Sequence, residues 1–243
     1  MTDPLTPLLD LPGVADAVAA ARDAVAEVHR HPANRRGWPT TAAEASVRAA
    51  RASAAIDGGD TDIPEGGEVT DPVLAGALRV AEAIGPLLPT WQRAPLQALA
   101  RLHVLAAADL TAEEDLGRPR VAPGVTSRLE LLAGLVAGGT KAPAPVLVAV
   151  VHGELLTLAP FARANGVVAR AAARLTMIGT GLDTKGLAVP EVSYLRKSGE
   201  YSAALAAFAS GEPEGVARWL VFSCESLQAG AREAASIADA AGG

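Results

Sequence analysis

The chain has 243 residues, half of them hydrophobic, with 3% aromatic residues and a formal net charge of −6. Acidic and basic residues are mixed without a basic run, which argues against a dedicated nucleic-acid-binding protein. Cys224 is the sole cysteine, so the sequence excludes an internal disulfide and fits a reducing compartment. The first residues, MTDPLTPLLDLPG, are acidic and interrupted by prolines, unlike a signal peptide, and no apolar run reaches membrane-spanning length. These features predict a cytoplasmic protein that binds neither nucleic acid nor membrane.

The composition favours helices, because Ala and Leu rank highest among helix formers. No alternating strand pattern of useful length and no internal repeat is present. In chain order, apolar periodicity and turn residues predict helices over 10–31, about 40–58, 71–84, 92–109, 127–137, 145–158, 165–178, 191–208 and 212–238. HPANRRGWP is predicted as a loop, and the helix that starts at residue 71 is predicted to stop near GPLLP. The predicted fold is all-α, with N-terminal helices in residues 1–70 and a helical core in residues 71–243.

The stretch LAPFARANGVVAR, residues 158–170, joins two predicted helices and contains no His, Asp, Glu or Ser. An Asn-Gly turn that opens a helix can present backbone N–H groups to a phosphate. One interpretation is therefore an anion cradle made by Asn165, Gly166 and Arg170, with Arg163 supplying a second positive charge. The other interpretation is a tight turn that only starts a helix.

The longer segment VHGELLTLAPFARANGVVARAAARL resembles the signature region of Fic (Fido) proteins, whose motif reads H-P-F-x-[D/E]-G-N-G-R-x-x-R between two core helices. LARLHVL, DLGRPR, EVSYLRKSGEYSAAL and GVARWLVFSCESL resemble, in the family's order, a core helix, the start of the substrate-aligning flap and the closing helices. The resemblance runs from about residue 40 to 230. It implies a Fic-like helical fold and, where the motif is intact, transfer of AMP from ATP to a hydroxyl side chain of a target protein.

The sequence departs from this motif at the positions that carry chemistry. Ala159 stands where the family has a His that acts as general base, a role worth roughly 10²–10⁴-fold in rate. Arg163 stands where an acid would hold Mg²⁺, and Val167 where an Arg would contact phosphate. Ala164 replaces a Gly that permits positive φ and a close backbone approach. The retained motif residues are Pro160, Phe161, Asn165, Gly166 and Arg170.

With these departures, the resemblance predicts a pseudoenzyme with a binding or regulatory role towards an unknown protein partner. ATP or another nucleotide is expected to bind weakly at most, and without Mg²⁺. No metal site is expected, because no Cys/His or His/His spacing suggests a zinc site and Arg163 replaces the acid that would hold Mg²⁺. Two alternatives stay open: an enzyme that moves a nucleotide or phosphate moiety by a modified mechanism, with a base such as Glu154, and an interaction module with an empty site. A homo-oligomer is also an open alternative.

The segment SAAIDGG resembles the family's inhibitory-helix motif, [S/T]-x-x-x-E-[G/N]. Ser53, Asp57 and Gly58 take its defined positions, with Asp in place of Glu. The resemblance implies a pair between Asp57 and Arg170, and Arg163 is the competing cation. A carboxylate at the C-terminal end of a helix is disfavoured by the helix dipole, so an acid there should have a partner. Without the motif His, such a pair would act as a structural clasp.

The remaining candidate residues are interpreted as structural. His152 lies seven residues before Ala159, about 10 Å by helix rise, so it is too distant to replace the missing base and is predicted to be a buried histidine. Cys224 is predicted to be a packed core residue. His29 and His31 are predicted to be solvated caps at the end of the first helix.

The flap is predicted to be an irregular loop. Family members use a β-hairpin here to add a strand to the target segment. Between Arg120 and the helix near Ser127 only a few residues are present, and they include Pro123 and Gly124. This length is too short for a hairpin with an open edge.

Overall fold

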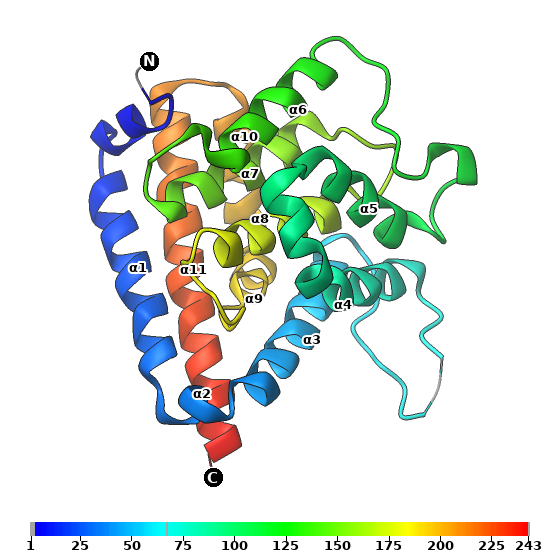
Figure 1. The fold of residues 1–243 in the computed structure, drawn as a ribbon, viewed down its shortest axis with the longest axis vertical. Coiled ribbons are helices and arrows are strands. Elements are labelled where there is room, and N and C mark those ends of the chain that lie inside the picture. Colours follow the sequence, from blue (N-terminus) through cyan, green and yellow to red (C-terminus); the bar gives the residue numbers. More distant parts are fainter. Residues whose placement is uncertain (1–2, 67, 243) are drawn as a thin grey trace.

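The structure is a computed structural model that describes residues 3–66 and 68–242, and within these residues every regular element is helical, as predicted (Figure 1). Three short helical turns accompany the main helices: η1 Thr6–Asp10, η2 Glu113–Asp115 and η3 Leu135–Gly139. The helices are α1 Val14–Arg30, α2 Pro32–Arg36, α3 Trp38–Ile56, α4 Pro72–Arg93, α5 Pro95–Ala107, α6 Val125–Gly134, α7 Ala144–Leu158, α8 Asn165–Gly179, α9 Pro190–Arg196, α10 Ser198–Ala209 and α11 Pro213–Gly242.

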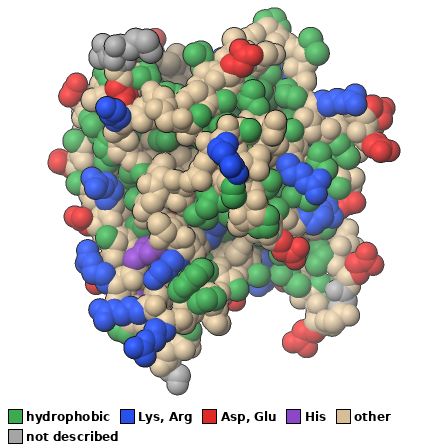
Figure 2. Space-filling view, viewed as in Figure 1, with side chains coloured by type: hydrophobic (Ala, Val, Ile, Leu, Met, Phe, Trp, Pro, Cys, Tyr) green, Lys and Arg blue, Asp and Glu red, His purple; other side chains and the backbone are tan. Residues whose placement is uncertain are grey.

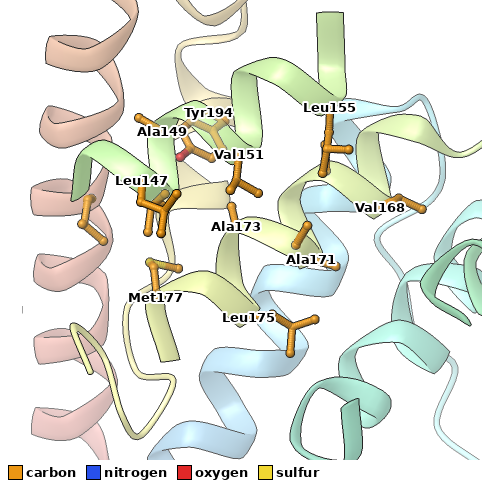
Figure 3. Packing of buried hydrophobic residues seen from close by; sticks show 14 of the residues in the cluster. Leu147, Ala149, Val151, Leu155, Val168, Ala171, Ala173, Leu175, Met177 and Tyr194 are labelled. Atoms are coloured by element: carbon orange, nitrogen blue, oxygen red, sulfur yellow. The ribbon is translucent and has the colours of Figure 1, made fainter. Parts of the chain in front are cut away.

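The helices α7 and α8 form the centre of the molecule. Helix α7 is apolar around most of its circumference, as expected of a helix that is surrounded by others. Helix α8 buries a run of alanines, which lets neighbouring helices approach it closely. Figure 3 shows side chains of α7, such as Leu147 and Val151, and side chains of α8, such as Met177, between the two helices. The loop that resembles the Fic motif therefore joins the two best-buried helices.

The other helices surround this pair (Figure 1). The long helix α11 packs against α1, α9, α10 and α7, whereas α4 packs against α5, α3 and α8. Gly76 allows the tight packing of α4 on α5, because a Cβ at this position would overlap the carbonyl of Ala106. Helix α3 contacts α4 on one side and α9 and α11 on the other, and it ends beside the start of α8. Its last residues are thereby brought to the α7–α8 loop.

Three boundaries differ from the sequence prediction. Helix α4 does not stop near residue 84 but continues through Pro86 and Pro89 to Arg93. A proline inside a helix removes one hydrogen bond and crowds the preceding turn, but the last turns of α4 bury Trp91 in the core. The predicted loop HPANRRGWP forms α2 and the first turn of α3, with Pro32 and Pro39 at helix starts, where proline is favoured. The predicted helix 191–208 is divided into α9 and α10.

Residues 117–124, the segment predicted to be an irregular flap loop, contain no strand in the structure, which confirms that prediction. Gly117 and Gly124 both have positive φ angles, of 73° and 79°, and they turn the chain at the two ends of the segment. The backbone N–H of Arg120 donates to the carbonyl of Pro160 at 2.8 Å. This backbone bond ties the flap to the α7–α8 loop, and residues 117–124 form no hairpin.

Among the described helices, α4 is long and apolar enough to cross a membrane, judged by length and composition alone. Core helices of globular proteins pass the same test. Helix α4 contains two prolines and packs against α3, α5 and α8.

The prediction that His29 and His31 are solvated caps is wrong for His29, whereas His31 is the C-cap residue of α1. The Nε2 atom of His29 lies 2.8 Å from a carboxylate oxygen of the buried Asp183, and that of His31 lies 3.1 Å from Asp239. Asp183 also accepts hydrogen bonds from the N–H groups of Leu187 and Ala188. His29 therefore ties α1 to the segment after α8, a long-range contact that the local sequence does not reveal.

The prediction that His152 is buried is confirmed. Its side chain lies on α7 with 1% exposure, and its Nε2 atom is 2.9 Å from the Tyr201 hydroxyl. The rings of Tyr194 and Trp219 pack around it. Burial lowers the pKa of His152 to about 3, and the positive charge of Arg170 adds to this effect. The imidazole is therefore neutral at physiological pH.

This buried histidine makes the stability of the protein depend on pH. The unfolded chain binds a proton at His152 below a pH of 6.5, whereas the folded chain does so only near pH 3. The free energy of unfolding should therefore fall as pH falls through this window, by about 2 kcal/mol between pH 7.5 and 5 from this group. His152→Gln, whose amide can still reach Tyr201, should remove this part of the pH dependence of the free energy of unfolding. Urea unfolding of both proteins at a series of pH values measures it, and parallel pH profiles would contradict the assignment.

Candidate functional site

The α7–α8 loop is built by two alanines in the left-handed backbone region. Ala159 has a φ of 42° and ends α7, while Ala164 has a φ of 56° and precedes α8. Between them Phe161 is buried. The side chain of Asn165 accepts a hydrogen bond from the N–H of Phe161 at 2.9 Å and donates one to its carbonyl at 2.8 Å. Asn165 therefore closes the loop on itself and does not use its amide in the predicted anion cradle.

Arg120 holds the other side of this loop, and sequence reasoning did not select it as a site residue. Its guanidinium donates through Nε to the carbonyl of Ala159 and through Nη2 to the carbonyl of Leu158, both at 2.7 Å. These carbonyls belong to the C-terminal end of α7, where a positive charge is favoured by the helix dipole. In the sequence, only its place in DLGRPR, the segment that resembles the start of the flap, could have pointed to Arg120.

His103 on α5 is a second residue that sequence reasoning missed. Its ring is fully buried and stacks on the ring of Phe161, with centroids 4.1 Å apart. Its Nδ1 atom accepts a hydrogen bond from the N–H of Gly117 at 2.9 Å. Burial lowers the pKa of His103, although the carbonyl of Arg163 and the charge of Asp115 oppose this effect. A neutral His103 therefore joins the flap segment to the α7–α8 loop.

The end of α3 reaches the first turn of α8. Gly58 adopts a φ of 83° and, with Gly59, returns hydrogen bonds to Ala55 and Ala54, which terminates α3 at Asp57. One oxygen of Asp57 accepts from Nη2 of Arg170 at 2.7 Å, and the other accepts from the N–H of Val167 at 3.1 Å. The carboxylate thus lies where a helix N-terminus would hold an anion.

Gly166 is required by this arrangement. A Cβ at Gly166 would overlap both carboxylate oxygens of Asp57. The glycine of the Asn-Gly turn therefore makes room for an anionic group on the first turn of α8. In this structure that group is a side chain of the same protein.

Arg170 is buried, and it donates hydrogen bonds to Ser53 and Asp57 at the end of α3. Its Nε atom donates to the hydroxyl of Ser53 at 2.8 Å, and Nη2 donates to the Ser53 carbonyl at 3.0 Å. Its side chain is 2% exposed and that of Asp57 is 25% exposed. Burial alone lowers the pKa of Arg170, but Tyr201 and the Asp57 carboxylate outweigh it and keep the pKa above its usual value.

The structure brings together part of the predicted site. Ser53, Asp57, Gly166 and Arg170 are in contact, and Gly58 ends the helix that carries the first two. Arg163 lies apart from them: it is exposed and makes no ion pair with any residue that the structure describes. The competing pair between Asp57 and Arg163 does not form.

The acidic side chains nearest the loop are engaged by arginines. In residues 3–66 and 68–242 no three His, Cys, Asp or Glu side chains are grouped so that they could hold a metal ion. Asp57, at the end of α3, places its carboxylate beside the first turn of α8 and pairs with Arg170. Glu154, one turn before the loop, receives two hydrogen bonds from Arg128, at 2.6 and 2.8 Å. Cys224 is buried as predicted, and burial raises its thiol pKa to about 12.

The pair between Asp57 and Arg170 should contribute strongly to stability. Asp57→Ala leaves a buried guanidinium without its anion, and the free energy of unfolding should fall by about 3–5 kcal/mol. Glu27→Ala is the matched control, because Glu27 pairs with Arg30 on the surface, and it should cost about 0–1 kcal/mol. A double-mutant cycle of Asp57→Ala with Arg170→Met, measured by denaturant unfolding, isolates the coupling. Additive effects would show that the two side chains do not interact energetically.

The comparisons with known proteins were made on both sequence and structure. No protein-family model matches the chain, and no curated protein matches its sequence. Among solved structures, a Fic family protein from Desulfovibrio desulfuricans G20 is similar, with a TM-score of 0.69 and 22% identity over 93% of this chain and 74% of that one.

The Fic-1 protein from C. elegans is also similar in structure, with a TM-score of 0.71 and 16% identity over 95% of this chain and 74% of the solved chain. A single-residue variant of the same Fic-1 fragment matches with a TM-score of 0.69 and 15% identity over 96% of this chain and 74% of that one. These identities are low, so the likeness speaks for the fold. The chain has the all-helical fold of Fic family proteins over nearly its whole length.

Proposed function

We propose that this protein is a Fic-fold pseudoenzyme that does not transfer AMP and acts by binding, in a regulatory role, to another protein. The observation that carries the proposal is the position of the Asp57 carboxylate. It lies on the first turn of α8 and uses the N–H of Val167 and the guanidinium of Arg170. These are the groups with which the motif would hold a phosphate, and they are engaged by the chain itself.

The side chains around the loop support the absence of proton transfer. A general base must come within hydrogen-bond reach of the hydroxyl that it activates. Ala159 offers only a methyl group at the motif position. His103 and His152 are both buried, and their pKa values are lowered by burial. Glu154, the base of the alternative with a modified mechanism, has both oxygens bonded to Arg128.

The electrostatics of the loop support weak ligand binding without metal. A phosphate that approaches α8 must first displace Asp57 and leave that carboxylate without its partner, which costs free energy. Arg163 stands where a metal-binding acid would be needed, and a cation is repelled by a guanidinium. A nucleotide is therefore held weakly at most, through Arg170 and backbone N–H groups, and without Mg²⁺. An interaction module with an empty site differs from this proposal only in binding no phosphate at all.

Incubation with α-labelled ATP and Mg²⁺ or Mn²⁺ tests the lack of catalysis. We expect no label on the protein or on added protein substrates, because neither a base nor a metal ligand is in place. Asp57→Gly should also remain unlabelled, since opening the cradle does not restore the missing groups. A Fic enzyme with an intact motif is the positive control, and the heat-denatured chain is the background. Label on the native chain above that background would contradict the proposal.

A further inference from the structure

Glu191, in the first turn of α9, is an acidic side chain inside the protein. Figure 2 shows acidic and basic side chains spread over the visible surface, where solvent reaches them, whereas Glu191 is only 3% exposed. Its Oε2 atom has no hydrogen-bond partner among the residues that the structure describes. The Nη1 atom of Arg174 lies 3.7 Å from this oxygen, which is beyond hydrogen-bond distance. A buried polar atom without a partner costs free energy, so this oxygen needs one.

Ser223, on α11, is a second buried polar group of this kind. Its side chain belongs to a residue that is 7% exposed, and within the described part of the chain its hydroxyl also has no hydrogen-bond partner. Glu191 and Ser223 line the same cavity, which lies between α7, α8, α9 and α11. Two unpartnered polar groups on the walls of one cavity indicate a polar occupant.

The volume of this cavity limits the occupant to one small molecule. The cavity measures about 10 Å³, which is close to the least volume that holds a single water molecule. An apolar protein cavity that admits benzene is far larger, at about 150 Å³. A neighbouring cavity of about 30 Å³ between α3, α4, α8 and α9 is also lined by Glu191 and is likewise too small for an organic ligand. Size therefore favours water.

The charges around the cavity favour a neutral occupant that can both donate and accept hydrogen bonds. Burial raises the pKa of Glu191, and the positive charges of Arg174 and Arg170 oppose this effect. A charged carboxylate accepts hydrogen bonds, whereas a neutral carboxyl also donates one, and water can serve as partner to both forms. A cation would be repelled by the two guanidinium groups, and an anion by a charged Glu191.

We propose that one ordered water molecule occupies the cavity between α7, α8, α9 and α11 and links the Glu191 carboxyl to the Ser223 hydroxyl. Buried waters typically make about three hydrogen bonds to polar groups that otherwise have no partner. Arg170, which pairs with Asp57, lines the same cavity. The water therefore joins α9 to α11 beside the arginine on which the Asp57 site depends.

A crystal structure of the full chain, at a resolution that shows ordered water, tests this site directly. We expect a density peak within hydrogen-bond distance of Glu191 Oε2 and of the Ser223 hydroxyl oxygen. An empty cavity, or a direct hydrogen bond between the two side chains, would overturn the proposal. NMR provides the same test in solution, because the methyl groups of Ala173 and Met177 line the cavity and should show nuclear Overhauser effects to a long-lived water molecule.

Two variants and a control identify the source of the solution signal. Ser223→Thr keeps a hydroxyl proton but adds a methyl group that should take the space of the water, so the signal at Ala173 and Met177 should be lost. Ser223→Val should have the same effect and serves if Ser223→Thr does not fold. Ser202→Ala, an exposed change on α10, should leave the signal unaltered. A signal that persists in Ser223→Thr would come from the hydroxyl proton itself and would overturn the proposal.

Discussion

The ion pair between Asp57 and Arg170 is the contact on which the arrangement of the site depends. A guanidinium with 2% exposure is tolerated only where its donors are bonded and its charge is matched. Ser53 and Asp57 at the end of α3 provide both. The pair fixes α3 against α8 and makes Gly166 necessary, because no side chain fits beneath the carboxylate. The site is closed as a direct result of how the buried arginine is neutralised.

The α7–α8 loop is held by its neighbours in a strained backbone conformation. Two alanines hold left-handed backbone angles that cost free energy, and such strain persists only where the surroundings impose it. Here the Asn165 amide, the Arg120 guanidinium and the stack of His103 on Phe161 impose the loop conformation.

The fold class could be predicted because helical periodicity and helix formers are local properties of the chain. The contact of Asp57 with Arg170 could be anticipated from a motif resemblance, together with the argument that an acid at a helix end needs a partner. The orientation of Asn165, the bond of His29 to Asp183 and the course of α4 through Pro86 could not be predicted. The His29 bond joins residues distant in sequence, and the course of α4 follows the burial of Trp91, so tertiary contacts override local preference there. The Asn165 amide bonds to Phe161, four residues away, in a loop geometry that periodicity does not describe.

The most direct measurement of the central claim, that Asp57 closes the phosphate cradle, is a thermal unfolding titration with tripolyphosphate in the absence of Mg²⁺. The account predicts no rise in the unfolding midpoint of the natural chain and a concentration-dependent rise for Asp57→Ala, which frees Arg170 and the N–H of Val167. Ser53→Ala, which weakens the same arginine contacts but leaves Asp57 in place, should behave like the natural chain. An equal rise in the natural chain and in Asp57→Ala would contradict the claim.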